Sequence, residues 1–247
     1  MTLSHDSDGS GSPVLLLHST VCDRRMWDPQ MVALASAGFR AVRCDLPGYG
    51  DSPVPVERFN TADQVMELLD GVDQFAVVGS SGGGLVALEI AARWPARVTA
   101  LALLCTAAPG MNPSPQLQEV WSQENAFIDA GDVAGATELM VNTWVGPLAD
   151  DATRSLVRDM QRRAYEVQLA APDTEEFEVP YGLEAITAPA LLVSGAHDLP
   201  DFRGIAEGLA TRLHHAVHVP LDWAGHLPSL EDPAALNDLL LPFLSER

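Results

Sequence analysis

The sequence predicts an α/β fold with a mostly parallel sheet, helices on both faces and an inserted helical cap. Short apolar runs alternate with longer helix-like segments in two stretches, and the stretch between them carries helical patterns alone. A length of 247 residues suits one sizeable domain of this kind. We therefore expect an α/β core over 13–111 and 185–247, a helical cap over 112–184, and a disordered or irregular N-terminus over 1–12.

The strands are expected where short apolar runs stand between turn residues. Their alternation with helices implies a parallel sheet covered on both faces. In chain order the runs are PVLLLH (13–18), FRAVRCD (39–45), QFAVVG (74–79), VTALALLC (98–105), ALLVSG (190–195) and HAVHVP (215–220). No strand is expected ahead of the first run, so the sheet would begin at residue 13.

Helices are expected between these strands. The segment over 61–71 has a threonine N-cap and a closing glycine, and the segment over 83–95 stops before a proline. Asp201 is expected to cap the helix that begins at residue 202. The expected helices are WDPQMVALASAG (27–38), TADQVMELLDG (61–71), GGLVALEIAARWP (83–95), DFRGIAEGLATRL (201–213) and DPAALNDLLLPFL (232–244).

The composition excludes several classes of function. Acidic residues number 34 and basic residues 14, for a formal net charge of −20. Such a charge repels phosphate backbones and anionic lipids, so neither nucleic acid nor membrane is expected as a partner. The chain contains no lysine, which excludes Schiff-base enzymes and Walker-type phosphate sites. Three distant cysteines and the lack of a secretory signal favour a cytoplasmic protein.

The segment VVGSSGGG, residues 77–84, combines a strand end, a glycine-rich turn and a helix start. Gly82, Gly84 and Ala87 match the loose dinucleotide pattern G-x-G-x-x-G/A, but that pattern needs an acidic residue after the next strand, which ends at Cys105 without one. The segment also matches G-x-S-x-G centred on Ser81, a register that Ser80 fails. A serine on such a strained strand-to-helix turn projects its hydroxyl above the sheet. Ser81 is therefore the candidate nucleophile.

A serine nucleophile on such a turn needs an acid and then a histidine later in the chain, each on a loop after a strand. Asp198 directly follows the strand ALLVSG, and His226 lies in the loop after HAVHVP. Asp198 is preferred over Asp201 and Asp222 because it stands at a strand end. Ser81 would attack, His226 would take and return the proton, and Asp198 would orient and stabilise the imidazolium.

Negative charge that develops on the substrate needs N–H donors. The backbone N–H groups of Thr20, after the first core strand, and of Gly82, after the nucleophile, are the candidate oxyanion hole. His18, in the same loop as Thr20, is interpreted as a structural histidine. The histidines within 214–218 have no cysteine or carboxylate at ligand spacing, so they are interpreted as surface or packing residues and no metal site is expected.

The segments LLLHST, RRMWDPQ, CDLPGYGDS, VVGSSGGG, LLVSGAHD and AGHLPSLEDP together resemble the α/β-hydrolase superfamily. Within it, RMWDPQ and the serine after His18 are similar to the 3-oxoadipate enol-lactonase branch. The resemblance runs from about residue 13 to the C-terminus and is weak across the cap. It implies an α/β-hydrolase fold with a helical cap, no cofactor, and hydrolysis of an ester or a lactone. It also places the roles given above on the same five residues.

Three features depart from the pattern of this superfamily. Members usually have two further strands before LLLH, and Ser19 stands where glycine is more common. Gly82 stands where methionine or leucine often follows the nucleophile, which leaves the substrate open. Serine as the nucleophile argues against the haloalkane dehalogenase and epoxide hydrolase relatives, which use aspartate at that position.

The sequence thus predicts a cofactor-free serine hydrolase that cleaves a small carboxylic ester or lactone through an acyl-enzyme. A carbon–carbon bond hydrolase or lyase on the same triad, and a non-catalytic protein that binds a small molecule, remain alternatives. Trp144 on the cap is expected to contact the substrate. Arg24, Arg162 or Arg163 could pair a substrate carboxylate, although a surface position is the simpler interpretation. The expected assembly is a monomer or a homodimer.

Overall fold

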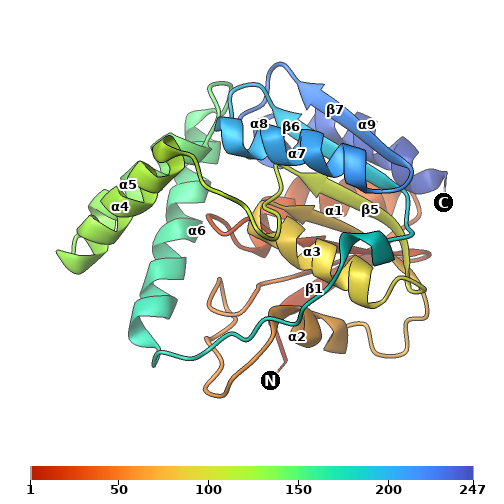
Figure 1. Cartoon of the computed structure of the whole chain (residues 1–247), viewed down its shortest axis with the longest axis horizontal. Coiled ribbons are helices and arrows are strands. Elements are labelled where there is room, and N and C mark those ends of the chain that lie inside the picture. Colours follow the sequence, from red (N-terminus) through yellow and green to blue (C-terminus); the bar gives the residue numbers. More distant parts are fainter. Residues whose placement is uncertain (1, 247) are drawn as a thin grey trace.

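The computed structural model describes residues 2–246 and contains, within them, one sheet of seven strands (Figure 1). The strands lie in the order β1-β3-β2-β4-β5-β6-β7, and every neighbouring pair is parallel except β1 and β3. They are β1 (His5–Gly9), β2 (Pro13–Leu17), β3 (Arg40–Cys44), β4 (Phe75–Ser80), β5 (Val98–Leu104), β6 (Ala190–Gly195) and β7 (Ala216–Leu221). The predicted fold class is confirmed, and each of the six expected strands forms within one residue of its expected bounds.

The expectation of an irregular N-terminus is wrong for residues 5–9, because they form strand β1 at one edge of the sheet. The sequence HDSDG has no apolar residue and its side chains are mostly exposed, so it lacks a hydrophobic strand pattern. Antiparallel pairing with β3 and two ion pairs hold it in place. Asp6 pairs with Arg43 at 2.8 Å and with Arg24 at 3.3 Å. The sheet therefore begins one strand earlier than expected.

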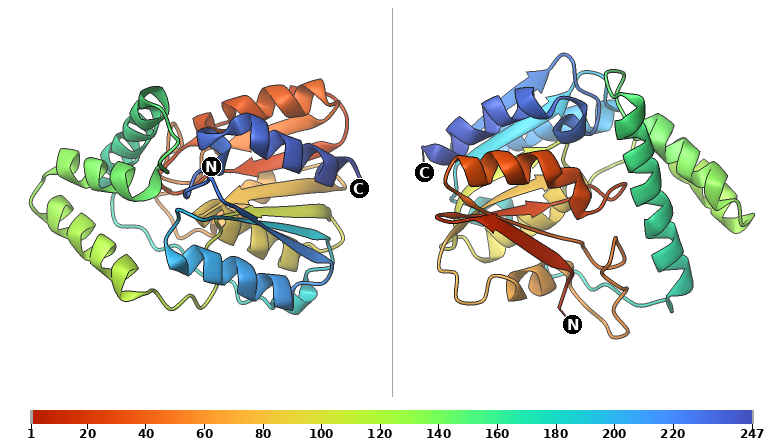
Figure 2. Two further views of the ribbon diagram at one scale, coloured as in Figure 1. Left: turned by 90° about the horizontal axis from the view of Figure 1, so that it is seen from above. Right: turned by 180° about the vertical axis from the view of Figure 1, so that it is seen from behind.

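Helices cover both faces of the sheet, as Figure 2 shows. Helices α1 and α9 pack on one face, while α2, α3 and α7 pack on the other. The elements around the sheet are α1 (Asp28–Ser36), α2 (Thr61–Glu67), α3 (Gly82–Arg93), α7 (Pro200–Arg212), α8 (Pro228–Glu231) and α9 (Pro233–Ser245), with short 3-10 helices at Arg24–Trp27 and Leu183–Ala185. Within residues 2–246, no helix combines the length and the apolar character needed to cross a membrane.

Alternate side chains of each central strand enter two hydrophobic cores, one on each face of the sheet. In β2, Val14 and Leu16 pack with α1 and α9, while Leu15 and Leu17 pack with α2 and α3. All four side chains are fully buried. Burial on both faces explains why these strands appear as continuous apolar runs. The two cores also hold the ends of the strands, from which the candidate site residues extend.

Three helices that follow β5 lie beside the carboxyl ends of the strands (Figures 1 and 2). We call them the helical insert: α4 (Pro115–Asp129), α5 (Val133–Trp144) and α6 (Asp151–Ala170). Each begins at a side-chain cap, because Ser114, Asp132 and Asp150 each accept a hydrogen bond from the backbone N–H three residues further on. The insert lies within the range predicted for the cap.

The chain returns from the insert to the sheet through residues 171–182, which are not helical. Pro172 follows the last turn of α6 and cannot continue its hydrogen bonds. The segment pairs instead with Phe59, whose N–H donates to Glu175 O at 3.2 Å and whose carbonyl accepts from Phe177 N at 2.8 Å. The helical pattern expected over the whole cap therefore ends early, at Ala170.

Candidate active site

Ser81 lies at the turn between β4 and α3, as the sequence predicts. Its backbone has φ 52° and ψ −117°, a left-handed conformation that is rare for residues other than glycine. Hydrogen bonds hold this strained turn: Ser81 N donates to Leu104 O at 3.0 Å, and Ser81 O accepts from Gly84 N at 2.9 Å. The surrounding fold therefore determines the position of the serine.

Glycine is required at positions 79 and 82, on either side of Ser81, because other atoms approach the backbone closely at both positions. A Cβ on Gly79 would lie 2.5 Å from Gly83 O, which is backbone and cannot move aside. A Cβ on Gly82 would lie 2.5 Å from Cγ2 of Thr20. The glycine after the serine thus allows the loop that contains Thr20 to pack against the start of α3.

His226 and Asp198 are hydrogen-bonded to each other, at 2.8 Å between Nδ1 and Oδ2. Their side chains are only 2% and 1% exposed. The second carboxylate oxygen of Asp198 accepts from Leu199 N at 2.7 Å. An ionised carboxylate can only accept, so His226 donates from Nδ1 and its Nε2 carries no proton in the neutral ring. Nε2 is then available as a base.

The two rival acids have other surroundings. Asp201 lies in the first turn of α7 and accepts hydrogen bonds from the backbone N and from Oγ of Ser114, both at 2.7 Å. The expectation that Asp201 caps this helix is wrong, because the N-cap position is Leu199. Asp222 is exposed. Of the three acids, Asp198 is the one bonded to His226.

Glu231, which the sequence analysis did not single out, holds the loop that contains His226. Its Oε2 accepts from Gly225 N at 2.7 Å and its Oε1 accepts from Leu227 N at 2.9 Å. The side chain is buried at the end of α8. The signal in the sequence was an acidic residue five positions after the histidine, in the otherwise apolar stretch HLPSLE.

Thr20 and Gly82 line a cavity that Ser81 and His226 also line. Neither of their backbone N–H groups donates a hydrogen bond to another residue within 2–246. Gly82 is the first residue of α3, where backbone N–H groups have no partner inside the helix. The helix N-terminus also adds partial positive charge at this point.

His18 anchors the loop that carries Thr20. Its Nε2 accepts from Leu46 N at 2.9 Å, so the ring proton is on Nδ1, which donates to Ser19 O at 2.8 Å. Burial lowers the pKa of His18, so the ring stays neutral and keeps both bonds. This agrees with the structural role expected for it.

The cavity has a volume of about 330 Å³ and lies between the sheet and the helical insert. Trp144, at the end of α5, forms part of its wall and is 5% exposed. The indole ring lies 4.5 Å from the His226 ring and 5.5 Å from the Phe202 ring, measured between centroids. Its Nε1 is buried without a hydrogen-bond partner among the described residues. The residue predicted to contact the substrate therefore lies beside the candidate base.

Comparison with known proteins shows the family of this chain. The model of the Alpha/beta hydrolase family matches residues 14–239. The chain belongs to the α/β-hydrolase family. The superfamily resemblance seen in the sequence is thereby confirmed.

Several relatives of this α/β-hydrolase have hydrolase names. A protein of Variovorax paradoxus (strain S110) described as a carbamate hydrolase is 27% identical over 262 residues, covering 99% of this chain and 97% of that protein. A pimeloyl-(acyl-carrier protein) methyl ester esterase of Neisseria meningitidis serogroup B is 29% identical over 245 residues, covering 94% and 92%. The solved enol-lactonase of Burkholderia xenovorans LB400 has a TM-score of 0.79 and 26% identity, covering 98% and 96%.

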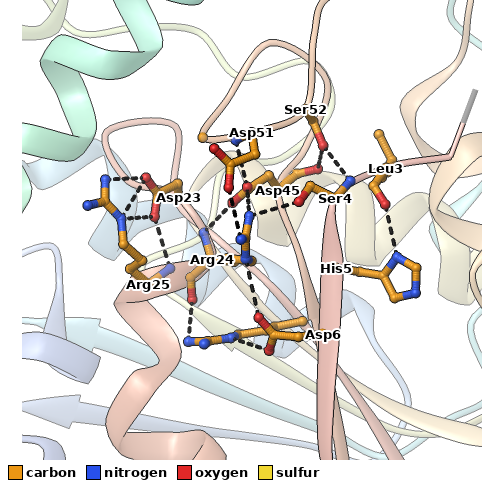
Figure 3. Close-up of polar contacts among 12 residues, drawn as sticks. Leu3, Ser4, His5, Asp6, Asp23, Arg24, Arg25, Asp45, Asp51 and Ser52 are labelled. Atoms are coloured by element: carbon orange, nitrogen blue, oxygen red, sulfur yellow. Dashed lines mark hydrogen bonds and ion pairs between the residues drawn. The ribbon is translucent and has the colours of Figure 1, made fainter.

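The arginines considered for a substrate carboxylate line a different cavity of this α/β-hydrolase. Arg24, Arg162 and Arg163 line a charged cavity of about 350 Å³, and none of them lines the Ser81 cavity. Arg24 is surrounded by carboxylates that Figure 3 shows: Asp6, Asp45 and Asp51. Arg162 pairs with Asp159 of its own helix, and Arg163 donates to Gly50 O at 3.1 Å. The three arginines therefore hold parts of the fold and do not line the Ser81 cavity.

Cys105 lies behind the His226–Asp198 pair in the α/β-hydrolase core. Among the residues that the structure describes, its Sγ, an Asp198 oxygen and a His226 nitrogen form one group of metal-ligand type, within 4.8 Å of one another. Burial raises the pKa of the Cys105 thiol well above its usual range, so the sulfur keeps its proton. A protonated thiol is a poor metal ligand. The group is better suited to packing than to metal binding.

Proposed function

We propose that this α/β-hydrolase is a cofactor-free serine hydrolase that cleaves a small carboxylic ester or a lactone. The observation that carries the proposal is the 2.8 Å bond between His226 Nδ1 and Asp198 Oδ2, on a ring that lines the same cavity as Ser81. That bond leaves Nε2 free to take a proton within the cavity. The esterase and the enol-lactonase among the similar proteins support this class of substrate.

In the acylation step, Ser81 Oγ attacks the carbonyl carbon while its proton passes to Nε2 of His226. Asp198 stabilises the imidazolium through Nδ1. The carbonyl oxygen becomes the oxyanion of the tetrahedral intermediate and accepts from the N–H groups of Thr20 and Gly82. The carbon–oxygen bond to the leaving group then breaks, and His226 gives its proton to the departing oxygen. That oxygen leaves as an alcohol or, from a lactone, stays on the acyl chain as a hydroxyl.

In the deacylation step, water attacks the acyl carbon and gives a proton to Nε2 of His226. The same two N–H groups bind the oxyanion of the second intermediate. The bond to Ser81 Oγ breaks as His226 returns the proton to that oxygen. A carboxylic acid leaves, and the serine is restored.

Trp144 is proposed as a substrate-binding residue. Its ring limits the space beside the His226 imidazole, and its Nε1–H is a buried donor without a partner among the described residues. A buried donor without a partner is unfavourable, so a substrate oxygen that accepts from it gains binding energy. This contact would hold the ester beside the base.

A fluorophosphonate probe tests the nucleophile, because it reacts with an activated serine. We expect wild-type protein to be labelled at Ser81 and Ser81→Ala to remain unlabelled, with kcat on 4-nitrophenyl butyrate lowered at least about 1,000-fold. Ser80→Ala is the matched control, since Ser80 is the adjacent buried serine of β4. It should keep both labelling and activity.

Three outcomes would contradict parts of the proposal. Labelling that persists in Ser81→Ala would overturn the assignment of Ser81 as the nucleophile. Labelling of Ser81 without turnover of any ester or lactone in a panel would favour carbon–carbon bond cleavage on the same triad. A wild-type protein that neither reacts with the probe nor turns over the panel would favour a non-catalytic binding protein.

A further inference from the structure

With His226 neutral, the lining of the Ser81 cavity contains more acidic than basic side chains. Of the described residues that line it, Glu124 is the one carboxylate, and no arginine is among them. Glu124 lies on α4 and is half-buried. An anionic group on a substrate would therefore meet a negative charge in the cavity and no cationic side chain except protonated His226. A cationic group would instead be attracted to Glu124.

A hydrogen-bonded cluster surrounds Glu124 and joins α4 to α6. Tyr165 donates from its hydroxyl to Glu124 Oε1 at 2.6 Å. Burial and the neighbouring Glu124 raise the pKa of Tyr165, so the hydroxyl keeps the proton that it donates. Gln161 lies one helical turn before Tyr165 on α6.

Gln161 Oε1 is a buried acceptor without a hydrogen-bond partner among the described residues. Gln161 is 4% exposed and lines the same cavity as Glu124 and Ser81. A buried acceptor without a donor is unfavourable, so a ligand that brings an N–H to it is bound more tightly. The cluster thus contains the negative carboxylate of Glu124 and the neutral acceptor of Gln161, and both accept hydrogen bonds.

We infer that the substrate is an ester or lactone bearing a protonated aliphatic amine, held by Glu124 and Gln161. An ammonium group has three N–H donors and no acceptor, which matches both oxygens. Tyr49, Trp121 and Tyr165 also line the cavity, and aromatic rings attract a nearby cation. The net charge of −20 attracts cations toward the protein at low salt. The inference rests on the proposed hydrolase function and specifies its substrate class.

Three matched 4-nitrophenyl esters test this charge preference. They are the 6-aminohexanoate, which carries an ammonium group, the heptanoate, which is its uncharged analogue, and the adipate monoester, which carries a carboxylate. We expect kcat/KM for the ammonium ester to exceed that for the heptanoate about tenfold, and the adipate to be slower still, as for one charge-assisted contact. The advantage of the ammonium ester should shrink as salt is raised.

Glu124→Gln tests the residue, and Glu119→Gln is the matched control on the same helix, exposed and outside the cavity. Relative to the heptanoate, Glu124→Gln should slow the ammonium ester about tenfold and speed the adipate, while Glu119→Gln keeps the wild-type order. The ratio of kcat/KM between two substrates is measured on one preparation of each variant. An inactive, misfolded fraction lowers both values equally and leaves the ratio unchanged.

The outcomes separate the two proposals. A heptanoate that reacts as fast as the ammonium ester, or a ratio that Glu124→Gln leaves unchanged, would overturn the amine inference while Ser81-dependent hydrolysis stands. Absence of Ser81-dependent turnover of all three esters, together with absence of fluorophosphonate labelling, would overturn the hydrolase function and the amine inference with it.

Discussion

Gly82 and Thr20 approach each other at the turn that carries Ser81, and this contact explains the glycine after the serine. A methyl group on residue 82 would lie 2.5 Å from Cγ2 of Thr20, well inside contact distance. Relief of that clash would move apart the two N–H groups proposed to bind the oxyanion. Such donors act at about 2.7–3.1 Å from the oxyanion, so small shifts matter. Gly82 therefore sets the separation of two loops.

We expect Gly82→Ala to lower kcat/KM on 4-nitrophenyl butyrate by up to about 1,000-fold, the effect of losing one oxyanion donor. Adding Thr20→Ser removes Cγ2 and should restore most of the activity, because Cβ and Oγ1 of residue 20 lie 3.7 and 3.8 Å from the added carbon. Thr20→Ser alone is the control and should remain near wild type. A double variant as slow as Gly82→Ala would show that this contact is not what requires glycine.

At the scale of elements, Glu231 ties the end of α8 to the loop before it through two backbone N–H groups. Both carboxylate oxygens are used, one by Gly225 and one by Leu227. An amide at this position would keep one acceptor and turn an NH₂ group toward the other N–H. Two donors would then face each other in a buried place, which disfavours the loop conformation that carries His226.

Glu231→Gln is therefore expected to lower the free energy of unfolding by about 1–3 kcal/mol, measured by urea denaturation. It should also lower kcat more than it raises KM, because the base shifts while the cavity wall is kept. Asp238→Asn is the control, since it makes the same change in charge at an exposed position of α9. Equal behaviour of the two variants would mean that Glu231 acts only through its charge.

The elements predictable from the sequence are those whose burial is visible in the chain itself. β2 carries a continuous apolar run because both of its faces are covered. β1 has no such run, and its formation depends on the free edge of β3 and on arginines distant in sequence. Asp201 stands at a helix start, yet its carboxylate binds Ser114 of the insert. Local patterns miss partners that another element supplies.

The candidate site also contains some residues that the sequence predicts and others that it does not. Ser81, Asp198 and His226 are predictable, because each follows a strand and parallel strands end at one edge of the sheet. Glu231 depends on how the histidine loop folds back on α8. Glu124 depends on the packing of the helical insert, where the resemblance to known families is weak. The proposed catalytic residues can therefore be predicted from local motifs, whereas the proposed substrate preference depends on tertiary packing.

At the scale of the whole molecule, acidic residues outnumber basic residues by 34 to 14. Seven of the thirteen arginines that the structure describes form ion pairs, such as those of Arg24 and Arg43 with Asp6. Many carboxylates therefore remain without a cation and repel one another across the surface. Such self-repulsion destabilises the compact state relative to the extended chain, where the charges lie further apart.

Salt should therefore stabilise the protein, mostly at low concentration. The Debye length falls from about 30 Å at 0.01 M to about 8 Å at 0.15 M, so most of the long-range repulsion is screened over that range. We expect Tm to rise by roughly 2–4 °C between 10 and 150 mM NaCl, which for a chain of this size is about 1 kcal/mol. Tetramethylammonium chloride should give the same rise at equal ionic strength, whereas sucrose at equal osmolality should not reproduce it. A Tm that stays flat or falls over this range would mean that local ion pairs, which salt weakens, outweigh the net charge.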